Sequence, residues 1–418
     1  MNFKSALIAA AAVVGVAGAA QAADLAKKAP AAANYVKVCD AYGAGFFYIP
    51  GSETCLKIGG YVRADVYAFS TSREWAGIGN SGATGRDKHA INTLAKAQLQ
   101  FDARTATEMG LLRSYIEVNI ANYSASNGNV LPELAKGFVQ FGGLTAGRAQ
   151  SFFDFWTGDT YGAWFEPAHS DANINLLGYT FAFGNGISAS VSIEDPSTGN
   201  TGRRMSLVNT ALAVNNTSYA GVKYPDFVAN VAISQAWGSA QIMGALHQNY
   251  AAIAPTDKWG YAVGAGVKVN LPMLGASDTL TLQAVYAKGA SSYVSPNWNT
   301  DGQFNGTVGA NAFDFWVPTT AIEQSSAWSV AGALTHGWTK TLTSSFEASY
   351  AAHDAATTSV FDFNQLDIQA NLVWSPVEGL AIGPEIEYRR LDYSGATNAL
   401  GVADVNAIVG MVRVQRNF

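Results

Sequence analysis

The chain has 418 residues, of which 13% are charged, 12% are aromatic and 42 are glycine. Soluble domains carry charge on roughly 25% of their residues. The low fraction of charged residues therefore argues against a surface exposed entirely to water and favours one that faces lipid. The net charge of −6 argues against nucleic-acid binding, which needs a basic face. No mature stretch approaches the ~20 apolar residues of a membrane helix, so any contact with lipid would be made by strands.

The first 22 residues have the pattern of a secretory signal peptide. Lys4 gives a charged start, residues 6–20 are apolar, and Ala20-Gln21-Ala22 has the form of a cleavage site. An N-terminal membrane anchor is the alternative, but it would need a longer apolar run. The mature chain would begin at Ala23, with a lead-in and cysteine loop over residues 23–55.

Cys39 and Cys55 are the two cysteines of the chain, and both lie in the mature part. In an exported protein, an even count at a spacing of 16 favours a disulfide. Metal binding is the alternative, but no histidine lies nearby and two thiolates are only half of a zinc site. We therefore predict a disulfide and no metal.

The stretch from Ala95 to Arg104, AKAQLQFDAR, alternates polar and apolar residues without a break. A period of two over ten residues predicts a strand whose two faces meet different solvents. The same alternation recurs in residues 61–68, 112–121, 366–373 and 405–418. Because lipid cannot satisfy an open sheet edge, a spanning sheet of such strands must close into a barrel.

Counting the alternating segments along the chain predicts sixteen strands. Short and mostly long connections alternate between them, as they do at the two rims of an outer-membrane barrel. Leu99 and Phe101 are among the side chains expected to face outward. The predicted strands are residues 56–70, 91–105, 110–123, 134–142, 143–150, 173–183, 187–195, 227–237, 240–251, 259–270, 278–289, 326–337, 340–353, 363–375, 379–393 and 403–418.

Residues 38–66, VCDAYGAGFFYIPGSETCLKIGGYVRADV, resemble the cysteine loop and first strand of the alphaproteobacterial general porins. The resemblance extends over the mature chain to a final strand that ends in Phe418. It implies an all-β transmembrane antiparallel barrel of 16 strands, trimeric, in the outer membrane of a Gram-negative cell, surrounded by lipid and lipopolysaccharide. It also implies a water-filled channel for passive diffusion of small hydrophilic solutes and ions, with no cofactor.

The connection over residues 151–173 differs from the other long ones because it contains seven aromatic residues among four acids. A loop that only met solvent would have no use for so many rings. In sixteen-stranded porins the third loop at this position folds inward and narrows the lumen, and this segment is similar in place and size. Packing on a neighbouring subunit is the alternative. The acids are Asp154, Asp159, Glu166 and Asp171.

Seven basic residues lie on the polar phase of the first five and last two predicted strands, which are contiguous in a closed barrel. With the loop acids opposite, they would set up a transverse electric field at the narrowest point. The alternative is that they form salt bridges within the wall, to Asp65, Asp102, Glu117, Glu385 or Glu387. The seven are Arg63, Lys96, Arg104, Arg113, Arg148, Arg389 and Arg413.

Three other functional classes fit the sequence less well. An enzyme would need a nucleophile held beside a base, yet no motif of that kind occurs and two of the five histidines, His247 and His353, are expected to line the pore. A substrate-specific channel would line its path with aromatic residues, whereas these cluster in one loop. A soluble secreted sandwich does not account for sixteen strands, two classes of connection and low charge together.

Overall fold

The computed structural model describes residues 37–69, 91–124, 130–162, 164–197, 202–206, 217–299, 312–356, 361–394 and 404–418. The predicted signal peptide and most of the lead-in lie outside these residues. Among the residues described, no helix is both long and apolar enough to cross a membrane.

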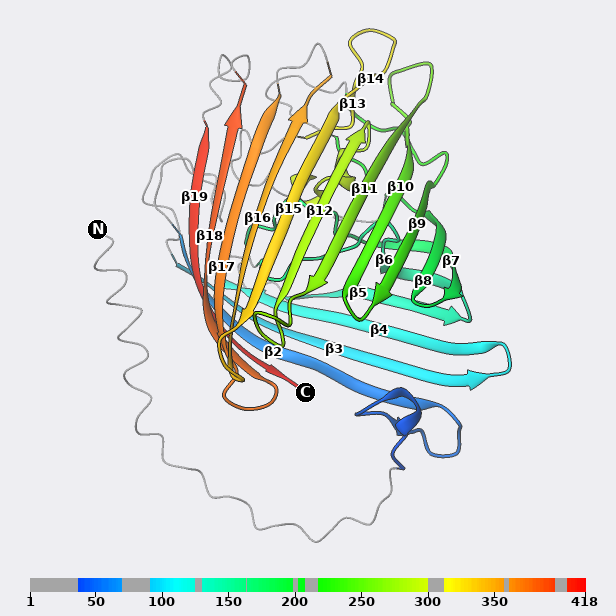
Figure 1. Ribbon diagram of the computed structural model, residues 1–418. Coiled ribbons are helices and arrows are strands. Elements are labelled where there is room, and N and C mark those ends of the chain that lie inside the picture. Colours follow the sequence, from blue (N-terminus) through cyan, green and yellow to red (C-terminus); the bar gives the residue numbers. More distant parts are fainter. Residues whose placement is uncertain are drawn as a thin grey trace, which may run out of the picture.

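Sixteen antiparallel strands of the described chain form one closed sheet (Figure 1). Each strand pairs with its neighbours in sequence, and β19 pairs with β2, with Val412 opposite Val66. All sixteen predicted strands are confirmed, with ends that differ by a few residues. They are β2 (Cys55–Phe69), β3 (Ile91–Thr107), β4 (Gly110–Tyr123), β5 (Leu131–Phe141), β6 (Leu144–Gln150), β7 (Asn173–Gly184), β8 (Ile187–Glu194), β9 (Asp226–Gln235), β10 (Gly238–Asn249), β11 (Lys258–Asn270), β12 (Thr279–Lys288), β15 (Ser326–Gly337), β16 (Leu342–Asp354), β17 (Phe363–Trp374), β18 (Leu380–Tyr393) and β19 (Val405–Asn417).

The closure of the barrel is completed by the last residue of the chain. The amide of Gly60 on β2 donates a hydrogen bond to the carbonyl oxygen of Phe418 at 3.2 Å, and the Phe418 amide donates to the Gly60 carbonyl oxygen at 3.1 Å. The seam between the first and last strands is therefore hydrogen-bonded up to the C-terminus.

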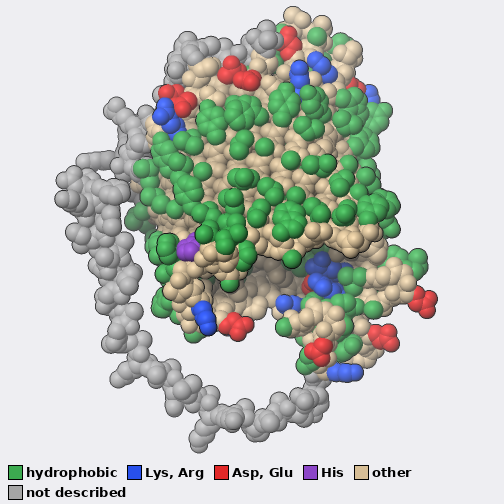
Figure 2. Space-filling view, in the orientation of Figure 1, with side chains coloured by type: hydrophobic (Ala, Val, Ile, Leu, Met, Phe, Trp, Pro, Cys, Tyr) green, Lys and Arg blue, Asp and Glu red, His purple; other side chains and the backbone are tan. Residues whose placement is uncertain are grey.

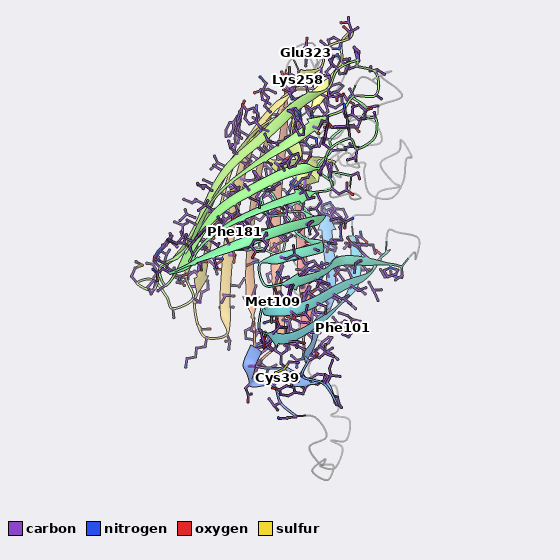
Figure 3. All side chains as sticks on the ribbon, turned by 90° about the vertical axis from the view of Figure 1, so that its right-hand side faces the viewer. Cys39, Phe101, Met109, Phe181, Lys258 and Glu323 are labelled. Carbon is purple, nitrogen blue, oxygen red and sulfur yellow. A yellow bond between two sulfur atoms is a disulfide. The ribbon has the colours of Figure 1, made fainter. Side chains whose placement is uncertain are left out.

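The alternation of side chains gives the barrel two different faces. On β3, Leu99 and Phe101 are 36% and 37% exposed and point outward, whereas Asp102 points inward and is 8% exposed. Hydrophobic side chains cover the outer face between two rims where charged residues gather (Figure 2). Figure 3 labels two of the outward rings, Phe101 and Phe181. The predicted orientation of Leu99 and Phe101 is confirmed.

Tight turns join the strands at the rim that holds the C-terminus. In Gly184-Asn185-Gly186, between β7 and β8, the three residues have φ angles of 84°, 50° and 75°. Glycine and asparagine tolerate this left-handed region better than other residues. A Cβ atom on Gly186 would also overlap the carbonyl oxygen of Ser234 on β9, so glycine is required there.

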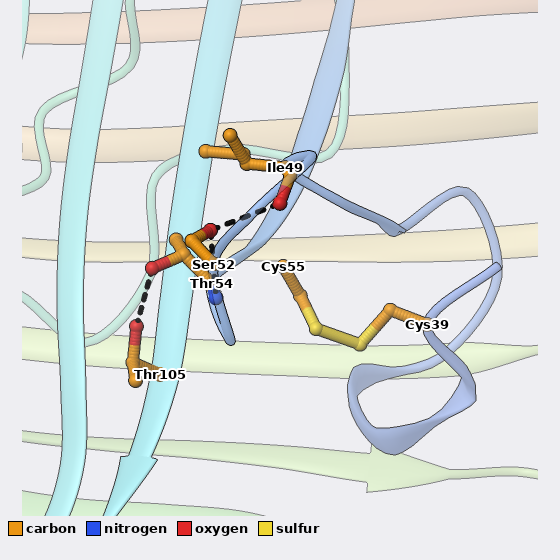
Figure 4. The surroundings of a disulfide bond; sticks show 6 residues. All are labelled: Cys39, Ile49, Ser52, Thr54, Cys55 and Thr105. Atoms are coloured by element: carbon orange, nitrogen blue, oxygen red, sulfur yellow. Dashed lines mark hydrogen bonds between the residues drawn. A yellow bond between two sulfur atoms is a disulfide. The ribbon is translucent and has the colours of Figure 1, made fainter. Parts of the chain in front are cut away.

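A small module below β2 carries the two cysteines. It contains the 3-10 turn η1 (Asp40–Tyr42) and the short strand β1 (Phe47–Tyr48), which pairs with the start of β2. Cys39 and Cys55 form a disulfide with their Cα atoms 6.0 Å apart (Figure 4), which confirms the prediction. The hydroxyl groups of Thr54 and Thr105 lie 3.0 Å apart and link the module to β3.

The long connections fill part of the interior towards the opposite rim. They include the 3-10 turns η5 (Ser291–Tyr293) and η6 (Pro296–Asn299) and the hairpin of β13 (Phe315–Trp316) and β14 (Glu323–Gln324). Tyr293 and Trp298 pack with Phe153 and Phe363 in the largest buried cluster. His247 and His353, expected to line the pore, are fully buried, because these connections cover them.

Candidate functional site

The segment between β6 and β7, residues 151–172, runs inside the barrel. Near its start, the side-chain amide of Asn230 on β9 donates to the carbonyl oxygen of Phe152 at 2.6 Å. Farther along, the backbone amides of Tyr161 and Phe165 donate to Glu385 at 2.6 Å and to Glu387 at 2.7 Å. Both carboxylates belong to β18. These bonds join the segment to two distant parts of the inner wall, so the predicted inward fold is confirmed.

Two aromatic rings of this segment occupy positions where the barrel wall has glycine and therefore no side chain. A Cβ atom on Gly178 would overlap the ring of Phe152, and one on Gly266 would overlap the ring of Phe155. The wall glycines of β7 and β11 therefore create the space that the two rings occupy. The aromatic content of the loop predicted that its rings pack against protein, but it did not predict these two contacts.

Two wall arginines lie against rings near the middle of the segment. The Arg413 guanidinium carbon is 4.3 Å from the centre of the Tyr161 ring, and that of Arg389 is 4.8 Å from the centre of the Phe165 ring. Cations over aromatic faces attract the ring quadrupole. Arg389 also donates to the carbonyl oxygen of Glu166 at 2.7 Å. These two predicted wall bases therefore hold the segment through its rings and backbone.

Two of the four loop acids form ion pairs with bases that were not predicted. Asp154 pairs with Arg203 at 2.9 Å, and their side chains are 1% and 0% exposed. Asp159 pairs with Lys268 on β11 at 3.1 Å. Arg203 lies in the long connection between β8 and β9, where polar and apolar residues do not alternate as they do in a strand, so its position could not be predicted.

The other two loop acids accept hydrogen bonds from neutral amides. Asn297 donates to Glu166, and Gln150 donates to Asp171 at 2.8 Å. Burial, followed by the negative charge of Asp154, raises the pKa of Asp171 to about 6. Burial and the neighbouring Asp171 likewise raise the pKa of Glu166. The net charge of the segment therefore depends on pH.

Four of the predicted bases bind carboxylates of the wall itself. Arg413 donates two hydrogen bonds of 2.8 Å to Asp65, and the Nε atom of Arg63 lies 3.4 Å from the same carboxylate. Arg104 and Arg113 both pair with Asp102, at 2.7 Å and 2.8 Å. These contacts agree with the alternative prediction that the basic residues form salt bridges within the barrel wall.

Arg389 likewise pairs with a wall carboxylate, that of Asp367 on β17. Lys96, by contrast, forms no hydrogen bond or ion pair with any described residue. Its side chain is half-buried on the inward phase of β3.

The predicted inward orientation of Arg148 is wrong. It lies opposite Gly137 on β5 and Asn175 on β7. Ala146 and Leu144 lie two and four residues before Arg148 and therefore on the same face of β6. Ala146 lies opposite Val139 and Leu144 lies opposite Tyr179, and both of these partners point outward. The inward phase of β6 contains Thr145, Gly147 and Ala149, whereas the larger polar residue Arg148 lies on the other phase. Placing the larger polar side chain inward therefore misidentified the face.

A cavity of about 470 Å³ separates the start of the segment from the wall. Asp154 lines it from the loop side, and Arg113 and Lys136 line it from β4 and β5. Loop acid and wall base therefore face the same space at this place. Its other lining residues are Tyr115, Phe138, Gln140, Thr145, Ala149, Gln150, Ser151, Phe152 and Asn230.

Lys136 was missed because a β-bulge reverses the phase of β5. Glu117 lies opposite Lys136 and Val118 lies opposite Leu134, which leaves Ala135 as an extra residue. Leu134 therefore points outward and is 51% exposed, although in sequence it shares a phase with Lys136. Bulges redirect side chains in this way near functional sites.

The model of the porin subfamily matches residues 24–411 of the chain. The chain belongs to the porin subfamily. Porin Omp2b of Brucella canis is 31% identical to it over 435 residues, with 100% of both chains covered. This porin is therefore a general channel of the outer membrane, with its short turns on the periplasmic side.

Two solved structures share the fold. The outer membrane channel DcaP of Acinetobacter baumannii superposes with a TM-score of 0.69 at 16% identity, covering 89% of this porin and 99% of that chain. OmpT of Vibrio cholerae in its trimer form gives a TM-score of 0.52 at 10% identity, covering 88% and 100%.

Proposed function

We propose that residues 151–172 form the constriction of this porin, and that small hydrophilic solutes and ions diffuse between this segment and the wall of β4, β5 and β6. The hydrogen bonds to β9 and β18 support this, because they fix both parts of the segment across the bore. The cavity lined by Asp154 on one side and by Arg113 and Lys136 on the other carries the proposal.

The charges around this cavity would create a transverse field. Asp171 adds a second carboxyl beside Gln150, which lines the cavity. Lys136 forms no ion pair with a described residue, whereas Arg113 is partly neutralised by Asp102 and Asp154 by Arg203. Low-dielectric walls strengthen such a field. A polar solute can align its dipole with it, while an apolar solute must displace oriented water.

Single-channel recording in a planar bilayer tests this proposal. Replacing Lys136 and Arg113 together by glutamine removes the basic side of the cavity, so the reversal potential in a salt gradient should move towards cation preference. Lys288→Gln with Arg390→Gln, two exposed residues of β12 and β18, is the matched loss of two charges outside the cavity. An unchanged reversal potential in the double variant would remove the cavity from the permeation path.

We further propose that the porin is a homotrimer. The outward orientation of Arg148 supports it, because a basic side chain on the lipid face of a barrel is destabilising. A neighbouring subunit would shield this group. The trimer form of OmpT, which shares the fold, is consistent with the same assembly.

Lipid acyl chains would surround the remaining hydrophobic band, with lipopolysaccharide in the outer leaflet. Trp338 and Trp374 are exposed near the periplasmic rim, where amphipathic rings prefer to lie. No catalytic activity is proposed. Liposome swelling with neutral sugars, run beside lipase and protease assays, separates a channel from an enzyme.

A further inference from the structure

Arg63 and Lys96 lie directly opposite each other on β2 and β3. Both are on the inward phase and both are half-buried. Directly opposed residues of an antiparallel pair have Cβ atoms roughly 5 Å apart, and like charges at such positions destabilise the sheet. The lumen therefore contains two adjacent cations that need compensation.

The wall carboxylate of Asp65, within ion-pair distance of Arg63, already accepts three hydrogen bonds from other residues. Arg413 donates to both of its oxygens at 2.8 Å, and the Tyr67 hydroxyl donates to Oδ2 at 2.9 Å. The Nε atom of Arg63 remains 3.4 Å from that oxygen, and it is buried without a hydrogen-bond partner. Asp65 therefore holds Arg413 more closely than Arg63, whose Nε atom is within ion-pair distance but has no hydrogen-bond acceptor.

Glu117 on β4 is also occupied. It accepts hydrogen bonds from Gln98 at 3.1 Å, from Gln100 at 3.2 Å and from the Tyr115 hydroxyl at 2.8 Å. Lys96 forms no hydrogen bond or ion pair within the described chain. Glu133 and Glu117 attract the Lys96 ammonium without a direct contact. An ammonium with no hydrogen-bond acceptor among the described residues thus faces a guanidinium whose inner nitrogen lacks one.

We propose that Arg63 and Lys96 form a binding site for an oxyanion, the carboxylate or phosphate group of a small organic solute. The guanidinium presents a planar set of N–H donors and the ammonium presents three more. An anion with two or three oxygens can accept from both side chains at once and remove their mutual repulsion. The site rests on the proposed function, because the solute reaches it through the lumen, and it adds a saturable preference for organic anions.

The test is a current measurement in a planar bilayer at fixed potassium chloride, with gluconate or inorganic phosphate added. In the unaltered porin, added anion should reduce the current to a plateau. The double variant Arg63→Gln, Lys96→Gln should need roughly tenfold or more anion for the same reduction, since each charged hydrogen bond contributes substantially. Lys96→Arg, which keeps the charge, should retain most of the effect.

The matched control removes two cations that lie away from the bore, Lys223→Gln with Arg390→Gln, whose side chains are 49% and 48% exposed. It should behave like the unaltered porin. A plateau with gluconate alone would assign the site to carboxylates, and one with phosphate alone would assign it to phosphates. A plateau at the same concentration in the double variant, or a decline without saturation in the unaltered porin, would overturn the site.

Liposome swelling with glucose distinguishes a failure of the proposed oxyanion site from a failure of the proposed diffusion channel. The double variant should pass glucose at the rate of the unaltered porin, since a neutral sugar does not use the site. If the unaltered porin passes no glucose, the general channel fails. If glucose passes but anions never saturate, only the oxyanion site fails.

Discussion

Asp171 carries a charge that varies with pH in the physiological range. Burial and Asp154 raise its pKa to about 6, so it is mostly ionised at pH 7 and mostly protonated at pH 5. Gln150 joins it to the cavity that we propose as the constriction. Lowering the pH therefore removes negative charge from the loop side of that cavity.

We predict that cation preference decreases as the pH falls from 7 to 5. The cation-to-anion permeability ratio should drop by a factor of roughly two to five, which corresponds to the ~1 kcal/mol interaction of two charges a few ångströms apart in water. The measurement is the reversal potential in a potassium chloride gradient. Asp171→Asn should show the low ratio at both pH values, and a full response to pH in that variant would assign the effect to another group.

Gly266 sets the position of the loop because the ring of Phe155 occupies the space of its missing side chain. We predict that Gly266→Ala displaces the ring and destabilises the folded porin by about 1–3 kcal/mol, the usual cost of overpacking. Thermal unfolding followed by circular dichroism measures the loss, and single-channel conductance should change with it. Gly410→Ala, where a Cβ atom meets nothing within 4 Å, is the matched control and should leave both properties unchanged.

At the scale of elements, the 151–172 segment is held mainly through its backbone. Glu347 on β16 accepts from the amides of Asp159 and Thr160 at 3.0 Å and 3.2 Å, and Glu385 and Glu387 continue the row on β18. The wall carboxylates thus bind N–H groups of the loop rather than loop cations. The segment is therefore attached by groups that any loop sequence could supply.

Removing these acceptors should free the segment. We predict that Glu385→Ala with Glu387→Ala increases open-channel noise and mean conductance in single-channel records, because the backbone amides of Tyr161 and Phe165 lose their partners. The paired Glu385→Gln, Glu387→Gln variant keeps an oxygen acceptor at each position and should stay closer to the unaltered porin. Equal noise in all three proteins would show that other contacts hold the loop.

The strands and the loop differ in how far sequence can predict them. The alternation of polar and apolar residues identifies β3, because one face of the strand meets water and the other meets lipid. The same reasoning places Leu99 and Phe101 on the outer face. It fails at β5, where one extra residue reverses the phase and hides Lys136. It also fails for β6, whose inward residues Thr145, Gly147 and Ala149 are small while Arg148 lies on the opposite phase.

At the scale of the whole molecule, Arg148 provides a test of assembly. If it lies between subunits, Arg148→Leu should weaken the trimer, and unboiled samples in detergent gels should contain more monomer. If it faces lipid, the same change should stabilise the monomer without altering the oligomer. Val139→Leu, at an outward position of β5, is a control for added bulk on the same face.

The overall barrel could be predicted almost completely from the sequence, whereas the partners of the site residues could not. Strand number, closure and the inward loop follow from periodicity and family resemblance. The pairing of Asp154 with Arg203, or of Asp159 with Lys268, joins residues far apart in sequence. Such contacts depend on how long connections pack, and no local pattern encodes that packing.

The hydrogen bonds between Gly60 and Phe418 have a consequence for biogenesis. The two strands that meet at this seam, β2 and β19, are the first and last of the barrel in sequence, so the ring cannot be completed until β19 has been synthesised and exported. A prematurely terminated product would keep two unpaired edges, which lipid cannot satisfy. Only molecules that contain both β2 and β19 can therefore insert as sealed pores.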